Sequence, residues 1–168
     1  MESPKGFSDR VEKWLSWVPG IGTYLDRERR RETDKKIREH LASRLQEARS
    51  LLKRLTVNFS QKGQLDPLVD VDRLSAHLQQ LADTIRYASY GYGGIFDPEK
   101  IREEELDRLY SFDLSLRDDL QGVQGQVEGM VQETAPETLT KKIQEAEYLL
   151  DAFEEKFRQR NDFMNRPA

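Results

Sequence analysis

Residues 66–86 read DPLVDVDRLSAHLQQLADTIR and carry the most regular hydrophobic pattern of the chain. The apolar residues of this stretch recur at alternating steps of three and four, at Val71, Leu74, Leu78, Leu81, Ile85 and, just beyond it, Ala88. Such steps place side chains on one face of an α-helix and are typical of coiled-coil-like seams. Asp66-Pro67 offers an N-cap followed by a proline in the first turn, so we predict a helix over residues 66–90.

The same alternation recurs in three further segments. Their stripes are Ile37, Leu41, Leu45, Ala48, Leu52, Leu55 and Phe59; then Leu106, Leu109, Phe112 or Asp113, Leu116, Leu120, Val123, Val127 and Met130; then Leu139, Ile143, Ala146, Leu150, Phe153 and Phe157. We therefore predict helices over about residues 23–61, 66–90, 97–133 and 136–164. The short connections favour antiparallel neighbours, which predicts an all-α fold, an elongated up-and-down four-helix bundle. Pairing of the seams between two chains is the alternative.

The start of the first long helix differs from the rest of the bundle. Residues 26–36 are polar on every side, with acidic and basic side chains interleaved. Such a stretch is usually a solvated helix held by neighbouring charge pairs. We expect it to protrude from the bundle.

A short amphipathic helix precedes the bundle. Its apolar residues are Phe7, Val11, Trp14, Leu15 and Val18, and Pro19-Gly20 ends it. We therefore divide the chain into residues 1–22, this helix and its turn, and residues 23–168, the bundle. The helix either packs across the bundle or lies in a membrane surface with its tryptophans at the headgroups.

Composition excludes several kinds of chemistry. The chain has no cysteine, so disulfides, thiolate catalysis and cysteine metal sites are excluded. Its two histidines, His40 and His77, are preceded three residues earlier by Ile37 and Leu74, so the Glu-x-x-His pattern of di-iron bundles is absent. Residues 91–94 are glycine-rich but lack the Gly-Lys-Ser/Thr of a phosphate loop. We expect no catalytic residues, no metal and no cofactor.

The charge is unevenly distributed. Residues 1–62 hold 15 Lys+Arg against 9 Asp+Glu, and residues 63–168 hold 12 against 22. A basic first helix against acidic later helices accounts for this, and acidic residues interrupt the basic stretch 27–38. Neither nucleic acid nor a small molecule is an expected partner. Without a leader or a long apolar run, we expect a cytoplasmic protein, or alternatively one at a membrane surface.

Two segments carry aromatic residues that a bundle does not require. Residues 86–97 join three tyrosines, a phenylalanine and three glycines, a composition typical of interaction hot spots. The alternative is an aromatic plug at the end of the bundle. The candidate partner-binding residues are Trp14, Trp17, Arg86, Tyr87, Tyr90, Tyr92 and Phe96. Asp113 lies near a seam, and if buried it needs a cationic partner, for which Arg86 and Arg102 are the candidates.

Two stretches resemble known sequences. Residues 17–41, from Trp17-Val18-Pro19-Gly20 onward, and residues 85–113 resemble segments of small bacterial helical proteins that have no assigned function. The resemblance covers about half of the chain and implies no activity. In outline, an amphipathic N-terminal helix before long charged helices is also similar to phage-shock-type membrane scaffolds.

These observations predict a non-catalytic helical scaffold or adaptor. It would bind a protein partner, or a second copy of itself, through the aromatic loop, the N-terminal Trp helix, or both. One alternative is a peripheral membrane protein that uses residues 7–18 as an interfacial helix. Another is an enzyme that holds a small ligand with Arg86, tyrosine hydroxyls and Asp113.

Overall fold

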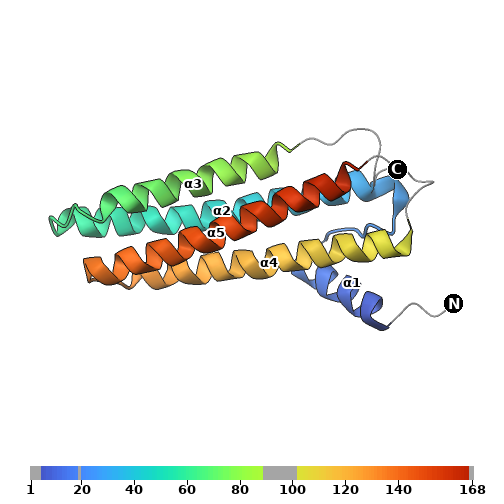
Figure 1. Cartoon of the computed structure of the whole chain (residues 1–168), viewed down its shortest axis with the longest axis horizontal. Coiled ribbons are helices and arrows are strands. Elements are labelled where there is room, and N and C mark those ends of the chain that lie inside the picture. The colour runs from blue at the N-terminus through green and yellow to red at the C-terminus, as the bar shows by residue number, and fades with distance from the viewer. Residues whose placement is uncertain (1–4, 19, 89–101, 167–168) are drawn as a thin grey trace.

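The computed structural model describes residues 5–18, 20–88 and 102–166. Within these residues every regular element is helical: α1 (Lys5–Trp17), a 3-10 turn η1 (Arg27–Arg29), α2 (Arg30–Gln61), α3 (Leu68–Arg86), α4 (Glu103–Val131) and α5 (Pro136–Met164). The predicted all-α fold is confirmed. Figure 1 shows the four long helices side by side along the long axis, consecutive ones running in opposite directions. α2 packs against α3 and α4, α5 against α4 and α3, and α1 against α4.

The predicted stripes form the core. Every stripe residue except Ala88 is buried, and on α4 the register selects Asp113 rather than Phe112, which is only half-buried. Burying a leucine or phenylalanine contributes roughly 1.5–3 kcal/mol, so these stripes are the main contacts that hold the long helices together.

The limits of two predicted helices are corrected. α2 begins at Arg30, not near Thr23, because turns and tertiary bonds hold the preceding residues, including a Tyr24 backbone N–H that donates to the Tyr110 hydroxyl at 2.8 Å. α3 ends at Arg86 rather than residue 90, and its N-cap is Pro67 without a side-chain bond, so Asp66 does not cap it. The predicted start of α4 at residue 97 lies outside the described residues.

The polar start of α2 does not protrude. Arg30, Thr33, Asp34 and Arg38 are at most 8% exposed. The connection after α1 folds back along them, and the Thr33 hydroxyl lies near Gly22. In Figure 1 this part of α2 lies at the end of the bundle where α4 begins and α5 finishes. The interleaved charges of residues 26–36 predicted an exposed helix, but neighbouring segments of the chain bury four side chains of this part of α2.

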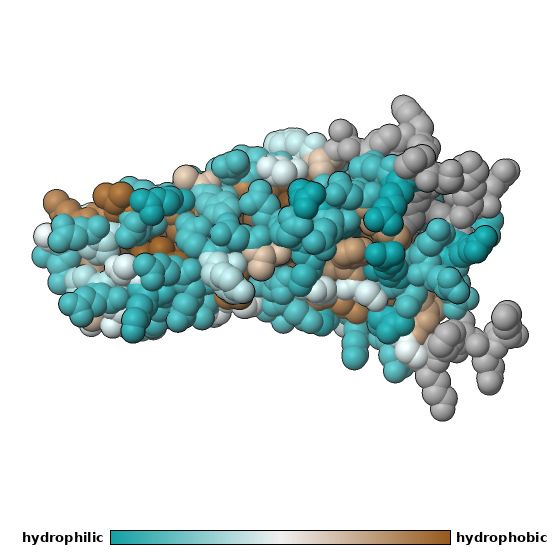
Figure 2. Space-filling view, viewed as in Figure 1, coloured by the Kyte–Doolittle hydropathy of each residue, from teal (hydrophilic) through white to brown (hydrophobic). Residues whose placement is uncertain are grey.

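The visible surface is largely polar. Figure 2 shows hydrophilic residues over most of this face, with apolar surface gathered at the end where α2 turns into α3. Val57, Leu65 and Val69 are more than half exposed there. Among the described residues, no helix combines enough length and apolarity to cross a lipid bilayer.

Candidate functional site

A buried arginine organises the end of the bundle where α2 begins. Arg160 of α5 is 0% exposed. Its Nε donates to Asp113 Oδ1 on α4 at 2.6 Å, and its Nη2 donates to Asp34 Oδ1 on α2 at 2.8 Å. The same Nη2 lies 3.0 Å from the hydroxyl oxygen of Tyr24. One guanidinium therefore joins three helices through charge-assisted bonds, which are about twice as strong as neutral ones.

Asp113 is fully buried, and its partner differs from the prediction. Its Oδ1 accepts from Arg160, not from Arg86 or Arg102. Its Oδ2 accepts from the Trp14 indole at 3.1 Å and from the Tyr24 hydroxyl at 2.8 Å. Both carboxylate oxygens are thus engaged inside the protein, and the small-ligand enzyme alternative would require Asp113 to leave these bonds.

Trp14, a candidate partner contact, is a core residue in this structure. It is 0% exposed, and its ring lies 5.1 Å from Tyr24 and 5.2 Å from Tyr110 between centroids. Arg10 forms a two-bond ion pair with Asp107, at 2.5 and 2.6 Å, which holds α1 against α4 at the surface. The apolar face of α1 is therefore turned to the bundle, and the membrane alternative would require α1 to detach.

Burial keeps the two tyrosines of this cluster protonated. Desolvation raises the pKa of Tyr110 to about 12, and desolvation together with the charge of Asp113 raises the pKa of Tyr24 well above its usual value. Both phenols are therefore neutral hydrogen-bonding groups near pH 7. Desolvation and the neighbouring Arg27 lower the pKa of Arg30, whose Nε donates to the Tyr24 carbonyl at 2.6 Å.

The network reaches the end of α3 through Arg38. Its Nε donates to Asp34 Oδ2 at 2.9 Å, and its Nη1 donates to the carbonyls of Arg86 at 2.9 Å and Ile85 at 3.4 Å. The last carbonyls of a helix have no partner within the helix, and a cation there is favourable. Arg38 therefore fixes the point at which the chain leaves α3, and the next residue, Tyr87, is 75% exposed.

The other predicted contact residues are dispersed. Trp17 is half-buried, and its ring lies perpendicular to that of His40 at 5.3 Å between centroids. Arg86 is half-buried and joins the network only through its carbonyl. Tyr90, Tyr92 and Phe96 lie outside the described residues. Of the seven candidates, Tyr87 is thus the one described as largely exposed.

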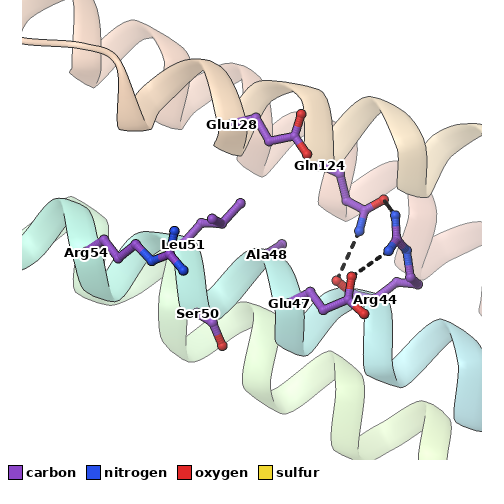
Figure 3. Close-up of a pocket in the computed structure, with 8 residues that line it drawn as sticks. All are labelled: Arg44, Glu47, Ala48, Ser50, Leu51, Arg54, Gln124 and Glu128. Carbon is purple, nitrogen blue, oxygen red and sulfur yellow. Dashed lines mark hydrogen bonds and ion pairs between the residues drawn. The ribbon is translucent and has the colours of Figure 1, made fainter.

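A groove lies between α2 and α4, and hydrogen bonds bridge it at one end. It has a volume of about 330 Å³, and its lining is shown in Figure 3. Arg44 bonds to Glu47 at 2.5 Å and to the Gln124 side-chain oxygen at 3.0 Å, and Gln124 donates back to the Arg44 carbonyl. These bonds join three of the eight lining residues at one end of the groove.

The residues that sequence reasoning missed lie on the stripes themselves. Arg160 follows Phe157 by three residues and precedes Met164 by four, and Asp34 precedes Ile37 by three. The stripe positions of three helices therefore hold Asp34, Asp113 and Arg160, all at one end. A search for charged residues in register with the apolar stripes would have found them.

A second polar cluster joins α3 to α5. His77 Nδ1 lies 2.7 Å from Glu147, and its Nε2 lies 3.3 Å from Glu154 and 4.0 Å from Asp151. Burial lowers the pKa of His77, but the bonds to Glu147 and Glu154 outweigh it and raise the pKa overall. The Glu-x-x-His pattern requires a glutamate and a histidine on one helix, so it does not detect a cluster whose histidine and carboxylates come from two different helices.

Comparison with known protein families, with curated proteins and with solved structures finds no match for this chain.

Proposed function

We propose that this chain is a non-catalytic helical scaffold or adaptor that binds a protein partner through the segment that begins at Tyr87. One observation carries the proposal: Tyr87 is 75% exposed and follows directly on a helix end that the buried Arg38 fixes. The likeness to small bacterial helical proteins fits this proposal but adds no activity to it.

An anchored tyrosine is well suited to recognition. Tyrosine is enriched among the residues that carry most of the binding free energy at interfaces. Binding also loses free energy when flexible groups must be ordered, and a fixed departure point reduces that loss. Arg38 is held by Asp34, Asp34 by Arg160, and Arg160 by Asp113, so three other helices brace the end of α3.

A photocrosslinking amino acid at position 87 tests the proposal. The matched control is position 148, because Tyr148 on α5 is also 75% exposed but lies within a helix. In an extract of the source cells, we expect position 87 to give a discrete adduct with one protein and position 148 to give none. Equal labelling at both positions, or none at 87, would contradict the proposal.

Substitutions supply the second arm. Tyr87→Ala should remove the adduct partner in pull-down experiments and change stability by no more than about 0.5 kcal/mol, as is usual for exposed positions. The pair Tyr90→Ala/Tyr92→Ala should also lose partner capture, with stability within about 1–2 kcal/mol. A larger stability loss for the pair would support the plug interpretation instead.

A further inference from the structure

The His77 cluster has the composition of a cation site. Glu147, Asp151 and Glu154 follow one another at steps of four and three on α5, so they share one face, and His77 approaches that face from α3. The ligand atoms of His77, Asp151 and Glu154 all lie within 4.8 Å of one another. This cluster is independent of the Tyr87 segment, and the inference goes beyond the proposed function.

The bond to Glu147 orients the histidine. A carboxylate only accepts hydrogen bonds, so His77 Nδ1, at 2.7 Å, carries the proton that it donates. Nε2 then faces Glu154 at 3.3 Å and Asp151 at 4.0 Å. This position holds either a second proton, which the two carboxylates favour, or a cation that replaces that proton. Metal-binding histidines commonly donate their other ring N–H to a carboxylate in this way.

The separations suit a small divalent cation. Bonds of about 2.0–2.2 Å from Zn²⁺ to nitrogen and oxygen place ligand atoms roughly 3–4 Å apart. The imidazole nitrogen already lies at such distances from both carboxylates. Their side chains are 72% exposed for Asp151 and 50% for Glu154, so each can rotate to close the remaining gap.

We propose that His77 Nε2, Asp151 and Glu154 bind a divalent transition-metal cation such as Zn²⁺, with Glu147 as the residue that orients the imidazole. Imidazole favours zinc and its neighbours, whereas oxygen-only sites suit Mg²⁺ and Ca²⁺. Three protein ligands leave a further position to solvent, in keeping with the exposure of Asp151. The cation would join α3 to α5.

A cationic side chain of the same groove is paired elsewhere. Arg73, one turn before His77 on α3, lines the same groove as Glu147 and Asp151 and pairs with Asp70 at 3.1 Å. Its side chain is 70% exposed. The carboxylates of α5 therefore keep their oxygens toward His77.

Calorimetric titration of the intact chain with Zn²⁺ tests the site. We expect one tight equivalent, lost in His77→Ala and retained in the control His40→Ala, which removes the other histidine of the chain. Glu147→Gln should weaken binding roughly 10–100-fold, the usual effect of losing an orienting carboxylate. The neighbouring Glu155→Gln should not weaken it.

Three results would overturn the proposal. Equal Zn²⁺ affinity in the wild type and in His77→Ala would leave the cluster as an imidazolium ion pair. Equal affinity for Mg²⁺ and Zn²⁺ would mean that the cation is held only by the carboxylates of α5 and not by the imidazole. Unchanged binding in Asp151→Asn, an exposed position at which the fold is retained, would also refute the ligand set. Far-UV circular dichroism on each variant establishes that it is folded.

Discussion

Replacement of Arg160 by methionine tests the buried network most directly. The guanidinium is fully buried and donates to Asp113 at 2.6 Å and to Asp34 at 2.8 Å. Methionine is unbranched, carries no charge and ends where the Nε of Arg160 lies. The substitution therefore removes the bonds to Asp113, Asp34 and Tyr24 together with the outer atoms of the guanidinium. Asp34 keeps Arg38 as a cationic partner at 2.9 Å.

Asp113 is the residue that this substitution isolates. Its remaining donors, the Trp14 indole and the Tyr24 hydroxyl, are neutral, so a buried carboxylate is left without a counter-charge. Removing one partner of a buried pair costs about 3–5 kcal/mol. Domains are stable by only about 5–15 kcal/mol, so this is a large part of the total. Urea unfolding followed by circular dichroism at 222 nm measures it, and Tm should fall by roughly 6–20 °C.

Two companion variants make the prediction refutable. Arg158→Met, two residues away, breaks only exposed ion pairs, with Glu155 and Asp162, and we expect no measurable change in stability. Asp113→Asn added to Arg160→Met should restore part of the loss, because the amide oxygen still accepts from Trp14 while the buried charge is gone. If Arg160→Met is no less stable than Arg158→Met, or the double variant no more stable than Arg160→Met, the reasoning is wrong.

Three further predictions follow from the same geometry. Absorbance at 295 nm should show Tyr110 ionising near pH 12. Because folding raises the pKa of this phenol, the folded state is fully favoured below the unfolded pKa of about 10. The free energy of unfolding should therefore fall by roughly 2–3 kcal/mol as the pH rises from about 10 to 12. Trp14→Phe keeps the ring contacts but leaves Asp113 one donor short, and urea titration should show a loss of about 1–3 kcal/mol. Gly63 has φ +69°, so Gly63→Ala should destabilise the protein by about 1–2 kcal/mol. Gly125 lies on α4 with open space around it, so Gly125→Ala should stabilise the protein by about 0.5–1 kcal/mol. Thermal melts of the two variants should therefore show Tm changes of opposite sign.

The helices were predictable because each long helix buries one face, and the apolar residues of that face recur at helical spacing in the sequence. Residues such as Leu74, Leu78 and Leu81 must be shielded from water together, and only a helix places them on one side. The connection before α2 was not predictable in this way. Tyr24 belongs to no stripe, and its position depends on Tyr110, which lies 86 residues later in the chain.

The candidate site was harder to predict than the fold. Asp34 and Arg38, one turn apart, look like any exposed helical ion pair, and their burial depends on the segment around Tyr24 and on the end of α5. Arg160 sits on an apolar stripe, but a search for periodic apolar residues passes over it. Trp14 has two plausible environments, and the decisive contact, Asp113, is 99 residues away.

The position of Arg160 also bears on how the chain is made. Tyr24 and Arg160 are separated by 136 residues, and α1 docks on helices that come later in the sequence. At roughly 5–20 residues per second, a ribosome needs roughly 7–27 s to add that length. During the first part of this interval Phe7 and Trp14 have been made, but Tyr110 of α4, which contacts both rings, has not. The apolar face of α1 therefore stays uncovered until α4 has been made, and the buried network that holds this end together is complete only when Arg160 follows.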